Sequence, residues 1–324
     1  MALIALAADK GAPGVTTAAV ALGAVWPRPV LVAECDLAGG DLVHRLPGEQ
    51  GLLDPGKGLL SLATSARRGL RPEQIAPHTQ RLNGGLDVLV GLTNAEQAAG
   101  MTWLWNPLGR SFAILPGVDV IADCGRLGPH TALVDLLREA DMVVLVTHAS
   151  VDHVAHLRER IAALSADLPK QRAHLGVIVI ADPRGFRDAI SEVERIIVAA
   201  KLPATVLGGL AFDPKGAHML RGPWGGRLDK SLLIRSAREL AVNLLRRPVL
   251  ESRNVPAGPP RHPTVTSAPP PRAQTGPQPV QRPAQGAPPI GSRGQAPQGS
   301  GHAVPPSGPH TGPQQVLGEP PRGR

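Results

Sequence analysis

Short apolar runs alternate with amphipathic stretches over residues 1–250, and this alternation constrains the fold more than any other feature of the chain. Runs that are apolar at successive positions predict strands buried on both faces, as in a parallel sheet. Strands that alternate with helices predict an α/β fold with a parallel-rich central sheet and helices on both faces. The predicted strands are Ala2–Ala8, Pro29–Glu34, Leu86–Gly91, Val118–Asp123, Met142–Thr147, Leu175–Ala181 and Thr205–Leu210. The predicted helices include Thr16–Val25, Pro129–Glu139, Val151–Ala166, Phe186–Ala200 and Lys230–Arg246.

The composition changes near Arg253, where the chain becomes rich in Pro, Gly, Gln, Ala and Ser. This stretch carries most of the net charge of +8, because it contains scattered arginines and a single acid, Glu319. It buries too little apolar surface to offset its chain entropy, so we expect a domain over residues 1–250 and a disordered tail over residues 251–324. The tail has three alternative interpretations: it has no function, it is a docking segment for an acidic partner, or it makes weak contact with nucleic acid.

Composition also limits the functions open to the chain. Aromatic residues make up 2% of the 324 residues, which argues against a surface that stacks single-stranded bases. The two cysteines, Cys35 and Cys124, exclude a disulfide-rich scaffold and a four-cysteine zinc site, and we interpret both as small buried residues rather than a redox pair. The aliphatic runs are shorter than the roughly 20 residues that span a bilayer, and the start lacks a basic leader, so we expect a cytoplasmic protein.

A glycine-rich loop follows the first predicted strand and leads into a helix, in the sequence DKGAPGVTTAAVAL. Gly11 and Gly14 allow a tight turn, and the free N–H groups at the helix start form a site for an anion such as phosphate. The Thr16 hydroxyl is placed to ligate Mg²⁺. Phosphate loops generally have Gly-Lys-Thr here, whereas this chain has Val15 in place of the lysine. A tight turn with a threonine cap is therefore the alternative interpretation.

Acidic residues follow two further predicted strands. Glu34, Asp36 and Asp41 surround a glycine pair after the second strand. The fourth strand ends on Asp123 and is followed by Gly125, which suits an acid that holds Mg²⁺ through water and an N–H group that faces a phosphate. In sheets of this class, ligands sit at the carboxyl ends of the strands. The three loops together therefore predict one phosphate and magnesium site.

In their order and spacing, these loops resemble those of the MinD/ParA family of P-loop ATPases, the deviant Walker A group, whose loop reads KGGxGKT[ST]. The segment KGAPGVTT, residues 10–17, is similar to it at the signature lysine, both flanking glycines and both threonines, and departs from it at Ala12 and Val15. VLVAECDLAGGDL resembles the switch I segment, closest to that of the CpaE-like pilus-assembly ATPases, and VDVIADCG resembles the Walker B and switch II segment. ADMVVLVT and GLAFDPKGAHMLRG are similar to later segments, so that the resemblance covers about residues 1–245.

The resemblance implies a three-layer P-loop NTPase sandwich that binds ATP and Mg²⁺. Lys10 matches the signature lysine, which in relatives reaches the partner's phosphates across an ATP-sandwiched dimer, and Asp36 matches the acid that orients the attacking water. Lys10 and Asp36 are therefore the expected catalytic residues, and Thr16 and Asp123 the expected Mg²⁺ residues. The expected nucleotide-binding residues are Gly11, Gly14, Val15, Thr16, Thr17, Gly125 and Asp213.

Val15 bears on how tightly a nucleotide binds. The loop lysine normally bridges the β- and γ-phosphates, and its loss forfeits a charged hydrogen bond worth roughly 1.5–3 kcal/mol, or about 10- to 150-fold in affinity. The backbone, Mg²⁺ and Lys10 remain, so binding is still expected. Arg126 either adds charge at the phosphates or is a surface ion-pair residue. Adenine is the expected base, on the resemblance, although Ala181 and Asp182 stand where relatives often have an asparagine.

Three functions are consistent with these observations. The leading one is a slowly hydrolysing Mg-ATP switch that forms a homodimer with ATP and positions or regulates a larger cytoplasmic or membrane-associated assembly, such as a pilus or secretion machine. Val15 raises a second, a non-catalytic scaffold or adaptor. The third, a ParA-like DNA partitioning factor, is disfavoured because the domain without its tail is near neutral. Nucleic acid is therefore not an expected partner.

The stretch Asp229–Leu250 predicts a basic amphipathic helix, a feature that MinD proteins use to bind membranes. Asp229 resembles an N-cap residue, and the stretch has few bulky aromatic residues to anchor it in a membrane. We therefore expect this helix to pack on the sheet, so that any membrane association is peripheral.

The tail is expected to be dispensable for folding. A chain truncated after Leu250 loses no periodic apolar segment, so its thermal midpoint is expected to stay within about 2 °C of that of the full chain. Differential scanning calorimetry of both chains checks this expectation. A larger drop in the midpoint would show that the tail packs on the domain.

Overall fold

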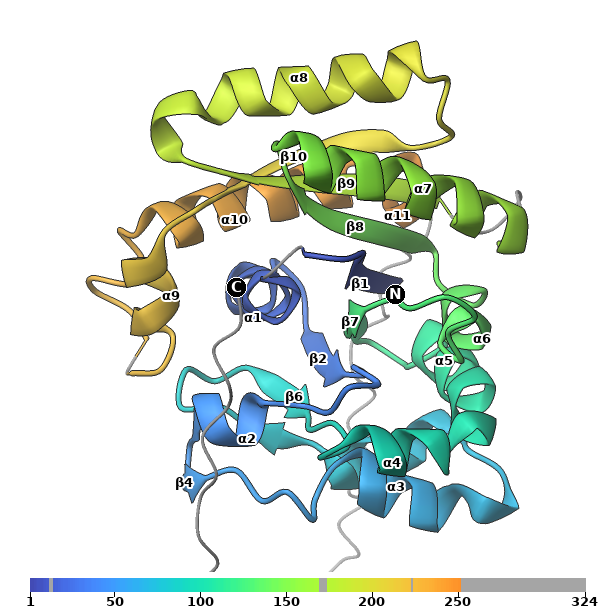
Figure 1. Cartoon of the computed structure of the whole chain (residues 1–324). Coiled ribbons are helices and arrows are strands. Elements are labelled where there is room, and N and C mark those ends of the chain that lie inside the picture. Colours follow the sequence, from blue (N-terminus) through green and yellow to red (C-terminus); the bar gives the residue numbers. More distant parts are fainter. Residues whose placement is uncertain (12–13, 169–173, 223, 252–324) are drawn as a thin grey trace, which may run out of the picture. The chain divides into compact units, whose positions relative to one another are not determined.

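The computed structural model describes residues 1–11, 14–168, 174–222 and 224–251, so the predicted tail beyond Glu251 lies outside the described residues. These residues form an eight-stranded sheet in the order β10-β9-β8-β1-β7-β2-β6-β5 (Figure 1). Every neighbouring pair is parallel except β5 with β6. The strands are β1 (Leu3–Ala8), β2 (Val30–Glu34), β5 (Gln80–Arg81), β6 (Asp87–Leu89), β7 (Asp119–Arg126), β8 (Met142–His148), β9 (His174–Ala181) and β10 (Thr205–Ala211). A separate hairpin pairs β3 (Pro47–Gly48) with β4 (Gly51–Leu52).

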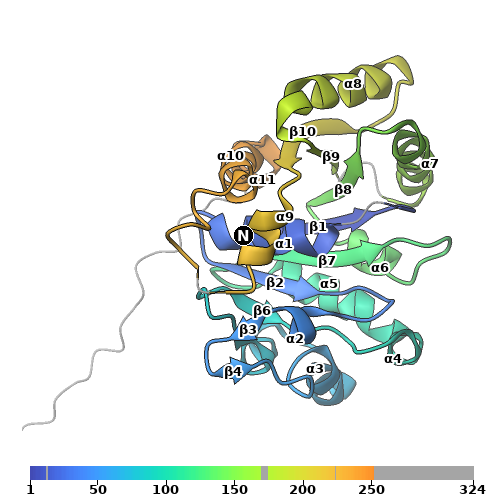
Figure 2. The same cartoon turned by 60° about the vertical axis from the view of Figure 1, so that its left-hand side comes forward.

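Helices cover both faces of the sheet, as Figure 2 shows. Successive residues of β1 pack against opposite layers: Leu3 and Ala5 belong to one buried cluster, and Ile4 and Leu6 belong to the other. The first cluster contains side chains from α3 (Leu59–Ser65), α4 (Ala95–Ala99), α5 (Trp105–Ala113), α6 (Val134–Leu137), α7 (Val151–Asp167) and α8 (Phe186–Ala199). The second contains side chains from α1 (Val15–Val25), α2 (Leu42–Arg45), α10 (Leu232–Leu245) and α11 (Pro248–Glu251), with α9 (Pro214–Met219) packed against it. The predicted three-layer α/β sandwich is confirmed.

Two sequence-based boundaries are wrong. The helix predicted over Pro129–Glu139 is reduced to α6, because His130 adopts a left-handed φ of 52° and Leu133 donates its N–H to the Thr131 hydroxyl in a turn. Asp229 does not cap the last long helix. The N-cap of α10 is Ser231, whose hydroxyl accepts the N–H of Ile234 at 3.2 Å. Among the described helices, none has both the length and the apolar character needed to cross a bilayer.

One buried carboxylate ties the starts of two central strands to the end of α1. Asp119, at the start of β7, is 2% exposed. Its Oδ1 accepts the N–H of Ala2 at 2.8 Å, and its Oδ2 accepts both the indole N–H of Trp26 at 2.8 Å and the Nε–H of Arg28 at 2.7 Å. A buried acid with this many charged and neutral donors fixes the relative positions of β1, β7 and α1, which also carry the loops at the other end of the sheet.

Removal of this carboxylate leaves the N–H groups of Ala2 and Trp26 without their acceptor and breaks the partly buried Arg28–Asp119 ion pair. Asp119→Ala is therefore expected to lower the free energy of unfolding by about 3–5 kcal/mol. Asp87→Ala removes the exposed Arg81–Asp87 pair and is expected to cost at most about 1 kcal/mol. Urea denaturation of both variants measures the two losses. Equal losses would show that the Asp119 cluster is no more than a surface pair.

Candidate functional site

The loop between β1 and α1 has the geometry of an anion site. β1 lies between β7 and β8, and β7 pairs with β2, so the loops that follow β1, β7 and β2 meet at one edge of the sheet. Gly14, at the N-cap of α1, has a φ of 109°, a conformation that favours glycine, and no side chain caps the helix. The first N–H groups of α1 are therefore directed at this edge, where they favour an anion. Ala12 and Pro13 lie outside the described residues.

Asp123 carries an incompletely satisfied carboxylate beside this loop. Its side chain is 1% exposed, Oδ1 accepts the N–H of Gly125 at 3.1 Å, and the Thr16 hydroxyl lies close enough to favour the charged carboxylate. Oδ2 is buried and has no hydrogen-bond partner within the described part of the chain. Burial, reinforced by the charges of Glu34 and Asp36, raises the Asp123 pKa from 3.8 to about 7, although the Thr16 hydroxyl and the bond from Gly125 lower it. A cation beside Oδ2 would remove this penalty.

Asp36 is the second acid of the site, and it lies directly against the last residues of β7. A Cβ at Gly125 would fall 1.9 Å from Asp36 Oδ2, and Gly125 has a φ of 55°, so only glycine fits there. Asp36 Oδ1 accepts the N–H of Ala38 at 2.8 Å. Burial raises the Asp36 pKa, a nearby Asp41 raises it further, and the Arg126 charge and the Ala38 bond lower it. Asp36, Asp123 and Gly125 are therefore brought together as the sequence predicted.

Glu34 is a buried acid whose role sequence reasoning missed. Its side chain is 1% exposed, Oε1 accepts the N–H groups of Asp41 and Leu42, and Oε2 accepts that of Gly91 at 2.9 Å. Burial raises the Glu34 pKa, although these three backbone bonds oppose the shift. Glu34 therefore organises the loop after β2 and fixes the start of α2. The signal in the sequence is an acid at the last position of an otherwise apolar strand.

Two side chains from α7 hold the phosphate loop from outside, and sequence reasoning predicted neither contact. Arg160 pairs with Asp9 at 3.0 Å and also donates to the carbonyls of Leu127 and Gly128, so it links the loops after β1 and β7. His153 contacts the Gly11 carbonyl through Nε2. Because both residues are far from the loop in the sequence, only the packing of α7 brings them there.

A cavity of about 420 Å³ lies on the α9 and α10 side of the loop. Gly14, Thr16 and Thr17 line one end of it, and the last residue of α2, Arg45, donates to the Thr17 hydroxyl at 3.4 Å there. The remaining wall is largely apolar and includes Ile180, Leu210, Phe212, Ala217 and Leu233. This size and mixture of surfaces suit a small ligand with an apolar body and a charged end.

The remaining predicted site residues differ in their exposure and in the contacts that they already make. Asp213 lines the cavity, but its carboxylate already accepts the N–H groups of Gly216, Leu232 and Leu233, so it joins α9 to α10. Val15 is 5% exposed and packs in the core around α1. Lys10 and Arg126 are exposed at the same edge of the sheet.

The other sequence signals are structural. Cys35, directly after β2, and Cys124, in β7, are both fully buried, and burial raises the pKa of each thiol well above its usual value, as expected of inert buried residues. Trp105 is a core residue with no exposed surface. Within the described ranges, no cluster of three or more His, Cys, Asp or Glu side chains could hold a metal.

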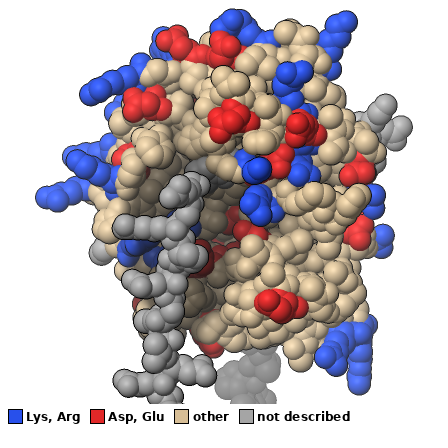
Figure 3. Space-filling model, viewed as in Figure 1, with Lys and Arg blue, Asp and Glu red and all other residues tan. Residues whose placement is uncertain are grey.

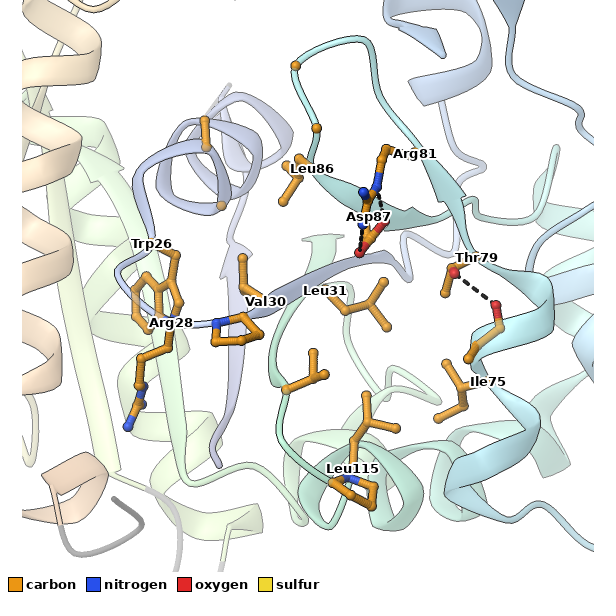
Figure 4. A pocket seen from close by; sticks show the side chains of 18 of the residues that line it. Trp26, Arg28, Val30, Leu31, Ile75, Thr79, Arg81, Leu86, Asp87 and Leu115 are labelled. Atoms are coloured by element: carbon orange, nitrogen blue, oxygen red, sulfur yellow. Dashed lines mark hydrogen bonds and ion pairs between the residues drawn. The ribbon is translucent and has the colours of Figure 1, made fainter. Parts of the chain in front are cut away.

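A second cavity, of about 580 Å³, opens at the opposite edge of the sheet, where β2 and β6 begin (Figure 4). Trp26, Val30, Leu86 and other apolar side chains line it. Its charged pair, Arg81 with Asp87, is self-neutralising. Because ligands of parallel α/β sheets sit at the carboxyl ends of the strands, the cavity beside the phosphate loop is the better candidate.

The raised pKa of Asp123 has a measurable effect on the metal-free protein. Folded Asp123 keeps its proton up to about pH 7, whereas the unfolded chain releases it near 3.8, so this group makes folding less favourable as the pH rises between these values. Asp123→Asn is neutral at every pH, and its stability advantage over wild type is expected to grow from pH 5 to pH 8, reaching roughly 1–4 kcal/mol. Urea denaturation in EDTA measures this advantage, with Asp188→Asn on the surface of α8 as the control. A constant difference between pH 5 and pH 8 would contradict the shift.

No protein-family model and no curated protein matches this sequence. Solved structures do match its fold. The cell division ATPase MinD of Pyrococcus furiosus is 17% identical, with a TM-score of 0.58 over 75% of this chain and 98% of that one. A ParA family ATPase from Chlorobium tepidum is 18% identical, with a TM-score of 0.57 over the same shares of the two chains. Cobyrinic acid a,c-diamide synthase of Mycobacterium smegmatis, solved with an ATP analogue and magnesium, is 22% identical, with a TM-score of 0.53 over 76% and 94%. The chain therefore has the fold of the MinD and ParA ATPases.

Proposed function

We propose that this chain is a P-loop ATPase of the MinD/ParA type that binds Mg-ATP, hydrolyses it slowly and acts as a dimerising switch in the cytoplasm. The observation that carries the proposal is the buried Oδ2 of Asp123, which has no hydrogen-bond partner among the described residues and belongs to a carboxylate close to the Thr16 hydroxyl at the start of α1. A buried carboxylate oxygen without a hydrogen-bond partner favours binding of a cation, and the uncapped helix N-terminus beside it favours binding of an anion. A magnesium ion with a phosphate satisfies both at once.

The residues present fit magnesium. Mg²⁺ keeps several of its waters and takes only one or two protein groups together with substrate phosphates, so it does not need a cluster of three protein ligands. Thr16 and Asp123 would hold it, directly or through water, and the ion would neutralise charge that develops on the phosphates. The Gly125 N–H is already directed at Asp123, which orients the acid before any ligand arrives.

Asp36 is the group that would position a water for attack. It lies against Gly125, and among the described residues its carboxylate accepts one hydrogen bond, from the N–H of Ala38 to Oδ1, so Oδ2 is available to a water. Its raised pKa makes it a better proton acceptor than an ordinary aspartate near neutral pH. Turnover is expected to be slow because no lysine of the phosphate loop stands in the usual position.

Lys10 is the residue that would couple ATP to dimer formation. It is exposed at the edge of the loop, where it can reach a second copy of the chain facing this edge. Charge that comes only from a partner makes nucleotide binding and dimerisation one linked event. The assembly that such a switch positions is proposed to be a pilus- or secretion-type machine, on the resemblance of the switch I segment.

Val15 favours a second function, a nucleotide-free scaffold of the same fold. Its buried side chain fills core space where a phosphate-binding lysine would otherwise begin. A DNA partitioning role receives less support. On the face shown in Figure 3, basic and acidic side chains are interspersed and no single basic surface dominates. Cooperative binding to duplex DNA requires a concentrated basic face.

Isothermal calorimetry with ATP and ADP, with and without Mg²⁺, is the first test, and Mg²⁺-dependent binding is expected. Light scattering is then expected to show more dimer with Mg-ATP than with Mg-ADP, and Lys10→Ala is expected to abolish that difference. Lys57→Ala, an exposed lysine away from the phosphate loop, is the matched control and should behave as wild type. A wild-type chain that binds neither nucleotide in calorimetry would favour the scaffold.

A further inference from the structure

We propose that Arg45 binds the phosphate group next to the nucleoside, the α-phosphate, and so supplies from the same chain the positive charge that Val15 removes from the phosphate loop. The inference rests on the proposed function, because it assigns a residue of the same nucleotide site. Arg45 belongs to no part of the sequence pattern that suggested that site.

Arg45 is placed at the charged end of the 420 Å³ cavity. It is half-buried, and its Nη2 donates to the Thr17 hydroxyl at 3.4 Å, beside the first turn of α1. A guanidinium has five N–H donors in a planar fork that matches two oxygens of one phosphate. The ion pairs between described residues do not include Arg45, so its charge is not neutralised by a neighbouring carboxylate there.

The residues that line the cavity with Arg45 indicate which phosphate group of the nucleotide it would contact. Asp36 and Asp123, which would meet the magnesium-bound end of the nucleotide, do not line the cavity. The cavity also has apolar lining residues, among them Ile180, Phe212 and Leu233, which suit a nucleoside. Arg45 lines the same cavity and donates to the Thr17 hydroxyl. The phosphate that reaches both the nucleoside wall and Thr17 is the first of the chain.

The backbone that carries Arg45 is held in place before any ligand binds. Glu34 accepts the N–H groups of Asp41 and Leu42 and so fixes the first turn of α2. Leu42 is 1% exposed, which anchors the same turn in the core. Because α2 is only four residues long, fixing its start also fixes the backbone of Arg45. A preorganised cation loses less freedom on binding than a mobile one.

Other basic residues at this edge are less suited to the role. Lys10 and Arg126 are exposed, and Arg160 pairs with Asp9 at 3.0 Å. His148 lines the cavity, but burial and the neighbouring His153 lower its pKa, so it is mostly neutral near pH 7. Arg45 is therefore the half-buried cation that faces this cavity.

The test measures the affinity of the full chain for adenosine, AMP and Mg-ADP by calorimetry, in wild type, Arg45→Met, Arg45→Lys and Arg67→Met. Loss of a charged hydrogen bond corresponds to about 10- to 150-fold. Arg45→Met is expected to weaken AMP and ADP by a factor in this range and to leave adenosine unchanged. Arg45→Lys is expected to recover part of the loss. Arg67, an exposed arginine after α3, is the matched control. Thermal melts confirm that all variants are folded.

Each outcome separates the two proposals. Equal AMP and ADP affinities in wild type and Arg45→Met would overturn the assignment of Arg45 and leave the proposed function standing. If Arg45→Met weakens the affinity for ADP but not for AMP, the α-phosphate assignment is overturned. If it weakens the affinity for adenosine as much as for AMP and ADP, the substitution acts on the shape of the cavity and not through the lost charge, and the assignment is overturned as well. If wild type binds none of the three ligands, the proposed function fails, and this inference fails with it.

Discussion

Three acids gathered at one edge of the sheet dominate the electrostatics of this molecule. Glu34 pairs with Asp123 on the neighbouring parallel strand, and Asp36 follows two residues after Glu34. Burial raises the pKa of all three; the charge of Asp41 adds to the shifts of Glu34 and Asp36, and the charges of Glu34 and Asp36 add to that of Asp123. The three carboxylates receive unequal numbers of hydrogen bonds. Glu34 receives three backbone N–H groups, whereas one oxygen of Asp123 receives none among the described residues. Glu34 is thus used to build the loop, and Asp123 remains available to a cation.

Positive charge reaches this edge from outside the phosphate loop. Arg160 on α7 ties Asp9 to the loop after β7, and Arg45 on α2 reaches Thr17 from the opposite side. The loop itself contributes only the exposed Lys10 and the backbone of α1. A site built in this way depends on the packing of two helices. If it binds a nucleotide as proposed, shifts of α2 or α7 would change the affinity more than they would in a loop that carries its own lysine. This coupling gives a switch a physical route from its surroundings to its ligand.

The sequence predicted the fold and the phosphate edge because both depend on local patterns. Apolar runs gave seven of the strands of the sheet, and turns with acids after them gave Asp36, Asp123 and Gly125. It missed the edge strand β5, which is two residues long, and the late start of α6, which depends on the backbone of His130. Arg45, Arg160 and His153 were missed for a different reason. Each acts on a loop 28 or more residues away, a distance that no local pattern encodes.

The energetics of Asp123 also weigh on the choice between a switch and a scaffold. A pKa raised from 3.8 to about 7 corresponds to as much as about 4 kcal/mol lost at and above neutral pH. That is a large part of the 5–15 kcal/mol that holds a typical domain together. A scaffold that binds nothing at this edge would be more stable with an asparagine, which keeps the bond from Gly125 and carries no charge. The same carboxylate beside a magnesium ion is stabilised in its charged form, so ligand binding recovers the energy that burial costs. The acid therefore favours the proposed switch over the scaffold, and under that proposal Val15 weakens nucleotide binding without abolishing it.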